Sequence, residues 1–177
     1  MPRGKRNNYN YYFPQRSLAP GRKNKYSSMT YYATNISRPN DPAYKWYFTI
    51  VDPTDVGGMR KVKNISIQLA YDAKYTDADG VIQYVRDQKI FWAIVYVPKG
   101  SLPGTLHQTG GLFYQPPQYI MSSGVYDCEQ PGNSSRIFTP LSRNLNAGDG
   151  IAFVYASTQE LYPLQITAII NYAITLQ

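Results

Sequence analysis

Residues able to do covalent or acid–base chemistry are few in this 177-residue chain. It holds a single histidine, His107, and a single cysteine, Cys128. One histidine cannot build a multi-histidine centre, and one cysteine cannot form a disulfide within the chain. Cys128 lies between Asp127 and Glu129, whose charges oppose the thiolate form that acts as a nucleophile. No serine stands in a G-x-S-x-G motif. We therefore expect no enzyme activity.

Carboxylates are the remaining candidates for a chemical site. Asp72, Asp77 and Asp79 fall in one short segment, and their oxygens could bind a hard cation. Their spacing does not match an EF-hand loop, because no glutamate follows at the required offset. The two glutamates, Glu129 and Glu160, show no relationship that suggests an acid–base pair. A solvated acidic turn is the more ordinary interpretation of the aspartates, so we expect neither a metal ion nor a cofactor.

The positive charge is confined to the start of the chain. The formal net charge is +7, and residues 1–26 hold seven of the 18 basic residues and no acidic one. The other 151 residues carry 11 basic and 11 acidic residues and are neutral as a whole. This asymmetry is typical of a basic arm that meets a polyanion.

The arm also lacks the pattern of a folded segment. Its prolines and glycines interrupt it, and it shows neither a helical nor a strand period, so we expect residues 1–28 to be disordered in isolation. Its rings alternate with its cations, and cations neutralise phosphates while rings stack on unpaired bases. The simpler alternative is a solvated tail that aids solubility. The predicted nucleic-acid contacts are Arg3, Lys5, Arg6, Tyr9, Tyr11, Tyr12, Phe13, Arg16, Arg22, Lys23 and Lys25.

The body of the chain, residues 29–177, has the alternation of β-strands. Apolar residues recur with a period of two in 44–51, in 61–70 with one slip near Lys63 that suggests a bulge, and most regularly in 164–177. We expect this last strand to run to the final residue. Residues 89–97 are apolar on both faces, as expected of a central strand. Further strands are expected at 29–36, 81–85, 119–126, 136–139 and 150–156, the last introduced by a turn over 146–149.

Turns and two long loops separate these strands. Residues 71–80 and 98–118 carry few core positions, and loops of that length are often contact surfaces. No segment shows a convincing helical period, and no run of 18 apolar residues predicts a transmembrane helix. We therefore predict an all-β fold, with about eight antiparallel strands in a two-sheet sandwich or closed barrel. The leading candidate is a jelly roll carrying a basic N-terminal arm.

Three segments resemble the capsid proteins of small circular Rep-encoding single-stranded DNA viruses. They are VYVPKG at 95–100, LFYQPPQYIM at 112–121 and RIFTPLSRNLNAGDGI at 136–151. The most specific part is LSRNLNAGD at 141–149. These motifs lie within residues 95–151, a stretch of about a third of the chain, and the layout of basic arm and all-β body is similar to that family throughout.

The resemblance implies a single jelly roll that self-assembles into an icosahedral shell, in the simplest case a T=1 particle of about 60 subunits. It implies that the arm contacts a circular single-stranded DNA genome inside the shell. The protein would be found in the virion and would enter the host nucleus, with the arm as import signal. The sequence does not identify a host receptor, and the loops at 71–80 and 98–118 are where a receptor-binding site would be sought.

The abundant tyrosines suit subunit interfaces, because each supplies apolar area and a hydroxyl group. Arg143 is expected to make polar contacts near an interface or to order the turn that follows it. The predicted interface residues are Tyr114, Tyr119, Arg143 and Asn144. Two alternatives stay open: a non-viral protein that binds single-stranded nucleic acid, and a jelly-roll carbohydrate-binding module or small hydrolase.

Overall fold

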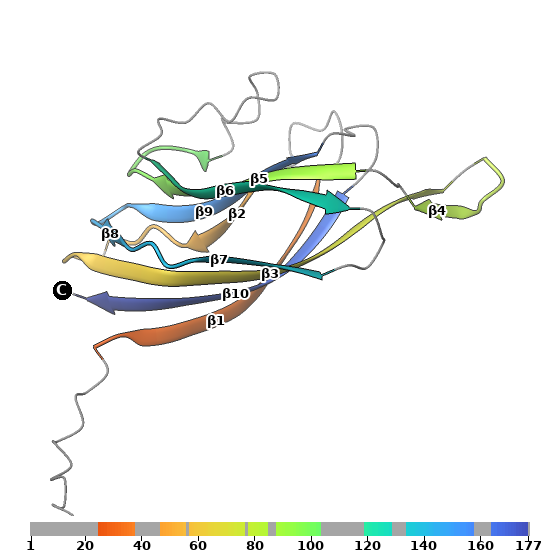
Figure 1. Ribbon diagram of the computed structural model, residues 1–177. Coiled ribbons are helices and arrows are strands. Elements are labelled where there is room, and N and C mark those ends of the chain that lie inside the picture. Colours follow the sequence, from red (N-terminus) through yellow and green to blue (C-terminus); the bar gives the residue numbers. More distant parts are fainter. Residues whose placement is uncertain are drawn as a thin grey trace, which may run out of the picture.

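The computed structural model describes residues 25–37, 47–55, 57–76, 78–84, 88–103, 119–128, 134–157 and 164–176 (Figure 1). These residues form ten strands and no α-helix. The expectation of an all-β fold is confirmed, but the strand count exceeds the expected eight, partly because residues 143–145 form a short strand that the sequence pattern did not indicate. The strands are β1 (Ser27–Ser37), β2 (Tyr47–Val51), β3 (Arg60–Thr76), β4 (Ile82–Tyr84), β5 (Gln88–Val97), β6 (Ile120–Cys128), β7 (Ser134–Thr139), β8 (Arg143–Leu145), β9 (Gly150–Ser157) and β10 (Leu164–Leu176).

The strands build two sheets that lie over one another as two layers (Figure 1). The first, which we call the β10 sheet, has the order β1-β10-β3, with β7 and β8 pairing successive parts of β3. The short β4 pairs only with the far end of β3. The second, the β9 sheet, has the order β2-β9-β5-β6. Neighbouring strands are antiparallel throughout the described residues.

The main core fills the space between the two sheets. Strand β10 shows how its sequence determines this, because every second side chain from Leu164 to Ile170 is almost fully buried. Tyr172 and Ile174 continue the same face at the margin of the core. The alternation therefore confirms the expected inward face, with one exception. Leu176, at the end of the strand, is 64% exposed.

Strand β5 is buried on both faces, as its continuous apolar sequence predicted. It lies between β9 and β6. Ile90 and Ile94 face the main core, whereas Ala93 and Val95 belong to a second, smaller apolar cluster. Alternate residues of a strand point to opposite faces, so this second cluster lies on the outward face of the β9 sheet.

Strand β3 contains the bulge that the sequence pattern suggested near Lys63. The register against β10 shifts between Asn171 and Ala173, and Asn64 has a φ of 55°. Asparagine is among the few non-glycine residues that tolerate this left-handed conformation. The bulge lies where β3 changes partner from β7 to β8.

The expected loop at 71–80 is wrong in its first half. Strand β3 runs on to Thr76, because its last residues pair with β4. Only residues 78–80 form a turn in the described part of this segment. Figure 1 shows this β3–β4 hairpin projecting beyond the two sheets.

Strand β1 begins at Ser27, two residues before the expected domain boundary at residue 29. It is joined to the other sheet by Tyr31, whose hydroxyl group lies 2.6 Å from the carbonyl oxygens of both Thr49 and Ile50. Burial raises the pKa of Tyr31 above its ordinary value, and the nearby Tyr172 and Asp52 add to the effect. Tyr31 therefore stays protonated and fastens the edge of the β10 sheet to β2.

Candidate nucleic-acid and assembly surfaces

The predicted nucleic-acid residues from Arg3 to Lys23 lie outside the described residues. Lys25 is described and is exposed. The next residue, Tyr26, already contacts the body, because the Lys63 Nζ lies 3.7 Å from the centroid of its ring. The arm is therefore joined to the body beside β3, although β3 lies two strands away from β1 in the sheet.

Two of the predicted interface residues meet on one tyrosine. The guanidinium carbon of Arg143 lies 4.4 Å from the ring centroid of Tyr96, and the ring of Tyr119 packs edge-on against the same tyrosine at 5.6 Å. Asn144 is exposed and, being next to Arg143 on β8, faces the other way. Tyr114 lies outside the described residues. Arg143 thus makes a cation–π contact within its own chain.

Tyr96 in turn donates a hydrogen bond to the carboxylate of Asp149, with 2.8 Å between its hydroxyl oxygen and Oδ2. The backbone N–H groups of Asn146 and Lys99 also donate to this carboxylate, at 2.8 and 3.1 Å. The Asn146 bond closes the turn at 146–149, in which Gly148 has a φ of 86°. Asp149 therefore organises the turn that the sequence predicted before β9.

The protonation states of this pair follow from these contacts. Burial by itself raises the pKa of Asp149, but the hydrogen bonds from Tyr96, Asn146 and Lys99 outweigh it and leave the pKa below its ordinary value. Burial, and then the hydrogen bond to Asp149, raise the pKa of Tyr96 to about 12. At neutral pH the carboxylate is charged and the phenol is neutral, which is the combination that the hydrogen bond requires.

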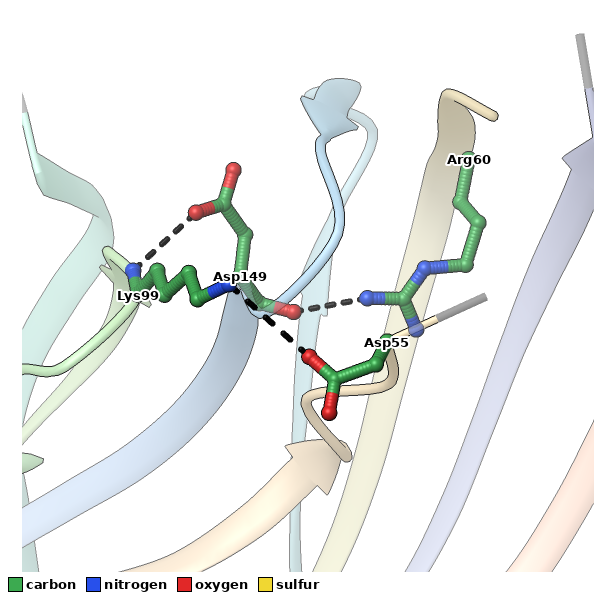
Figure 2. Close-up of polar contacts among 4 residues, drawn as sticks. All are labelled: Asp55, Arg60, Lys99 and Asp149. Carbon is green, nitrogen blue, oxygen red and sulfur yellow. Dashed lines mark hydrogen bonds and ion pairs between the residues drawn. The ribbon is translucent and has the colours of Figure 1, made fainter. Parts of the chain in front are cut away.

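Arg60 reaches the same place from the opposite sheet. Its side chain is 6% exposed and donates to the backbone carbonyl oxygens of Asp149, at 2.7 Å, and Asp52, at 3.0 Å. Figure 2 shows Arg60 and Lys99 on opposite sides of Asp149. Asp52 follows β2 and Asp149 precedes β9, so one arginine of β3 holds the adjacent ends of two neighbouring strands of the β9 sheet.

We call Arg60, Tyr96, Arg143 and Asp149 the Asp149 cluster. Sequence reasoning singled out only Arg143 among them. Tyr96 and Asp149 both fall inside the sequence motifs given above, but no spacing rule indicates that residues 53 positions apart share a hydrogen bond. Arg60 and Arg143 belong to the β10 sheet, whereas Tyr96 is on β5 and Asp149 precedes β9, so this arrangement suits a structural clasp between the two sheets.

A pocket of about 390 Å³ lies beside this cluster, at the same end of the sandwich. Its lining includes Tyr47, Pro53, Pro103 and two charged residues, Asp55 and Lys99. Those two form an ion pair of 4.0 Å with largely exposed side chains (Figure 2), a geometry that contributes little to stability. The charges of the pocket therefore balance each other.

The described residues form neither a metal-binding group nor a membrane-spanning helix. In these parts of the chain, no three His, Cys, Asp or Glu side chains come together as a metal-binding group. Asp72 lies on β3 and Asp79 in the β3–β4 turn, and Asp77 lies outside the described residues. The same residues contain no helix long and apolar enough to cross a membrane.

No family model matches the chain, and no curated protein matches it.

Proposed function

We propose that this protein is a viral capsid subunit that self-assembles into a small icosahedral shell around single-stranded DNA, with the basic arm contacting the nucleic acid inside. The observation that carries the proposal is the separation of charge. All of the net charge of +7 belongs to residues 1–26, and the body that folds into two sheets is neutral. A neutral wall can pack against copies of itself without net repulsion, while the arm attracts a polyanion.

The fold that we propose for the body is a jelly roll, and strand order supports it. If β7 and β8 are taken as one interrupted strand along β3 and β4 as an addition, eight main strands remain. When these eight strands are numbered 1 to 8 along the chain, they lie side by side in the order 1-8-3-6 in the β10 sheet and 2-7-4-5 in the β9 sheet. Each sheet thus alternates early and late strands, as two wound Greek keys do. Jelly rolls of this kind recur in viral capsids and lectins.

The charge of the arm sets how much of a genome it can neutralise. About 60 arms with seven cations each would bring roughly 420 positive charges to the interior, so counterions would cover the remaining phosphates. The choice of DNA and the location in the virion and host nucleus rest on the resemblance described above. Phosphate contact and stacking alone do not distinguish DNA from RNA.

Electron microscopy and size-exclusion chromatography of the purified full chain test this proposal. We expect closed particles of uniform diameter, whose absorbance ratio at 260 and 280 nm reports enclosed nucleic acid. Monomers or small oligomers at every salt concentration and pH would overturn it. In that case, binding to bare single strands would favour the non-viral nucleic-acid-binding alternative, and retention on immobilised glycans would favour the carbohydrate-binding module.

A further inference from the structure

The two sheets differ in the chemistry of their outward faces. Among the described residues of the β9 sheet, the outward face carries the small apolar cluster around Ala93 and Val154, and its charged residues Lys89 and Asp127 lie 3.9 Å apart as a pair. This face is therefore neutral. An ordinary solvent-exposed surface also carries positive and negative charges together, so this balance by itself does not indicate a binding partner.

The outward face of the β10 sheet is basic. Its cations are Lys61 and Lys63 on β3 and Arg136 on β7, and exposed Lys25 lies just before β1. Outward positions follow from the alternation of β3, where Val62 is buried while Lys61 and Lys63 are partly exposed. The described acidic residue on this face is Asp72, which pairs in register with Gln165 towards the other end of the sheet.

Aromatic rings lie beside these cations. Lys63 covers the ring of Tyr26, and Arg136 shares its face of β7 with Phe138, which is 54% exposed. Tyr32 on β1 is 72% exposed. The register places Tyr32 and Arg136 in one row across the sheet, through Ile169 and Gln68. The next outward row holds Thr30, Asn171 and Ser66 and ends at Phe138. Thr30 donates a hydrogen bond to Asn171 in this row, with 2.6 Å between the oxygens.

We infer that this outward face of the β10 sheet is a second binding surface for single-stranded nucleic acid, in addition to the arm. The inference rests on the proposed function and deepens it, because it assigns which wall of the subunit faces the nucleic acid. The chemistry is phosphate contact by Lys61, Lys63 and Arg136, with bases stacking on the exposed rings.

Either a nucleic acid or the basic arm of the same chain could lie on this face, and their charges distinguish the two. Residues 1–24 carry six cations and no acid, so the arm has the same sign as the face and is repelled by it. A polyanion is attracted to both. The contact between Tyr26 and Lys63 joins the arm to this face, so a strand held by the arm is brought directly onto it.

The test compares two variants of the full chain that lose the same charge from different faces. K61Q/K63Q neutralises the β10 face, and K89Q/K99Q removes two exposed lysines elsewhere. Binding of a fluorescein-labelled oligo-dT of roughly 20 nucleotides to the unassembled subunit of each full-length variant and of the parent is measured by anisotropy over a range of salt concentrations. We expect the slope of log K against log salt to become shallower by about 1.4 for K61Q/K63Q and to stay unchanged for K89Q/K99Q.

Other outcomes overturn the inference in distinguishable ways. Equal changes in both variants would mean that only total charge matters. No change in K61Q/K63Q, while deletion of residues 1–24 abolishes binding, would leave the proposed function standing without this surface. If an acidic protein binds this face in place of nucleic acid, oligo-dT binding by K61Q/K63Q would likewise be unchanged. Failure of the parent chain to bind oligo-dT would remove the proposed function itself.

Discussion

The guanidinium group of Arg143 on β8 stacks over the ring of Tyr96 on β5, with 4.4 Å between the guanidinium carbon and the ring centroid. The two residues belong to different sheets, and the hydroxyl group of the same tyrosine is bound to Asp149 at the start of β9. An arginine predicted to serve an interface is therefore also part of a clasp within the subunit.

Replacing Arg143 tests the energy of that contact. We expect Arg143→Ala to lower the stability of the subunit by about 1 kcal/mol, because a partly desolvated cation–π contact is lost. This corresponds to a fall in Tm of roughly 2–4 °C, which thermal unfolding of the unassembled subunit would measure. The matched test is a double-mutant cycle with Tyr96→Leu, in which Arg143→Ala should cost almost nothing further. An unchanged Tm together with normal assembly of Arg143→Ala would contradict both proposed roles of this residue.

Acid should weaken the Asp149 cluster. The pKa of Asp149 is below its ordinary value in the folded chain, so the unfolded chain binds a proton first as pH falls. The stabilisation is present above the unfolded pKa of about 4 and is lost as pH falls through the lower folded value. Denaturant unfolding between pH 2 and 7 measures this loss. We expect Asp149→Asn to be less stable than the parent at pH 7 and to depend less on pH below 4.

Alkali should act on the other partner of the same hydrogen bond. The pKa of Tyr96 is raised to about 12, so the folded chain keeps a proton that the unfolded chain releases near pH 10. Its contribution is complete below pH 10 and disappears as pH rises towards 12. Tyr96→Phe keeps the ring under Arg143 but removes the titrating group, so its stability should fall less steeply from pH 10 to 12. A parallel decline in both proteins would assign the alkaline loss to other tyrosines, such as Tyr31 and Tyr172, whose pKa values are also raised.

The bulge at Asn64 provides a test of backbone strain. A β-branched residue does not tolerate its φ of 55°, so Asn64→Val should lower stability by about 1–2 kcal/mol, whereas Asn64→Gly should change it by only a few tenths. The control is Gln68→Val, at an exposed position of the same strand, where valine suits an extended backbone. Chemical denaturation compares the three variants. Equal effects of valine at both positions would rule out strain as the cause.

The local sequence pattern predicted most of the strands, because the alternation of apolar and polar residues shows which side chains face the core. The start of β10 and its inward residues from Leu164 to Ile170 were predicted from alternation, and the slip at Lys63 located the bulge. The end of β3 was missed because residues 71–76 are mainly polar. They are strand through long-range pairing, 71–73 with β10 and 74–76 with β4.

The Asp149 cluster was missed for a different reason. It depends on how two sheets are placed against each other, which sequence spacing does not encode. Arg60 is the clearest case: on its own strand it looks like a surface residue, but its two carbonyl partners come from the ends of β2 and β9.

Removal of residues 1–24 should separate folding from nucleic-acid binding. The cut leaves Tyr26 and its contact with Lys63 in place and removes six cations. We expect the shortened chain to keep its sheet content, measured by circular dichroism, because the two sheets and their core lie outside the deleted segment. Its oligo-dT affinity should fall, and the salt slope should become shallower by about 4, since each single-strand phosphate contact contributes roughly 0.7. A control chain with the six cations replaced by glutamine should behave in the same way, because the effect comes from charge. If the shortened chain bound as tightly as the parent, the arm would not be the principal nucleic-acid contact, and the basic face of the β10 sheet would have to account for binding alone.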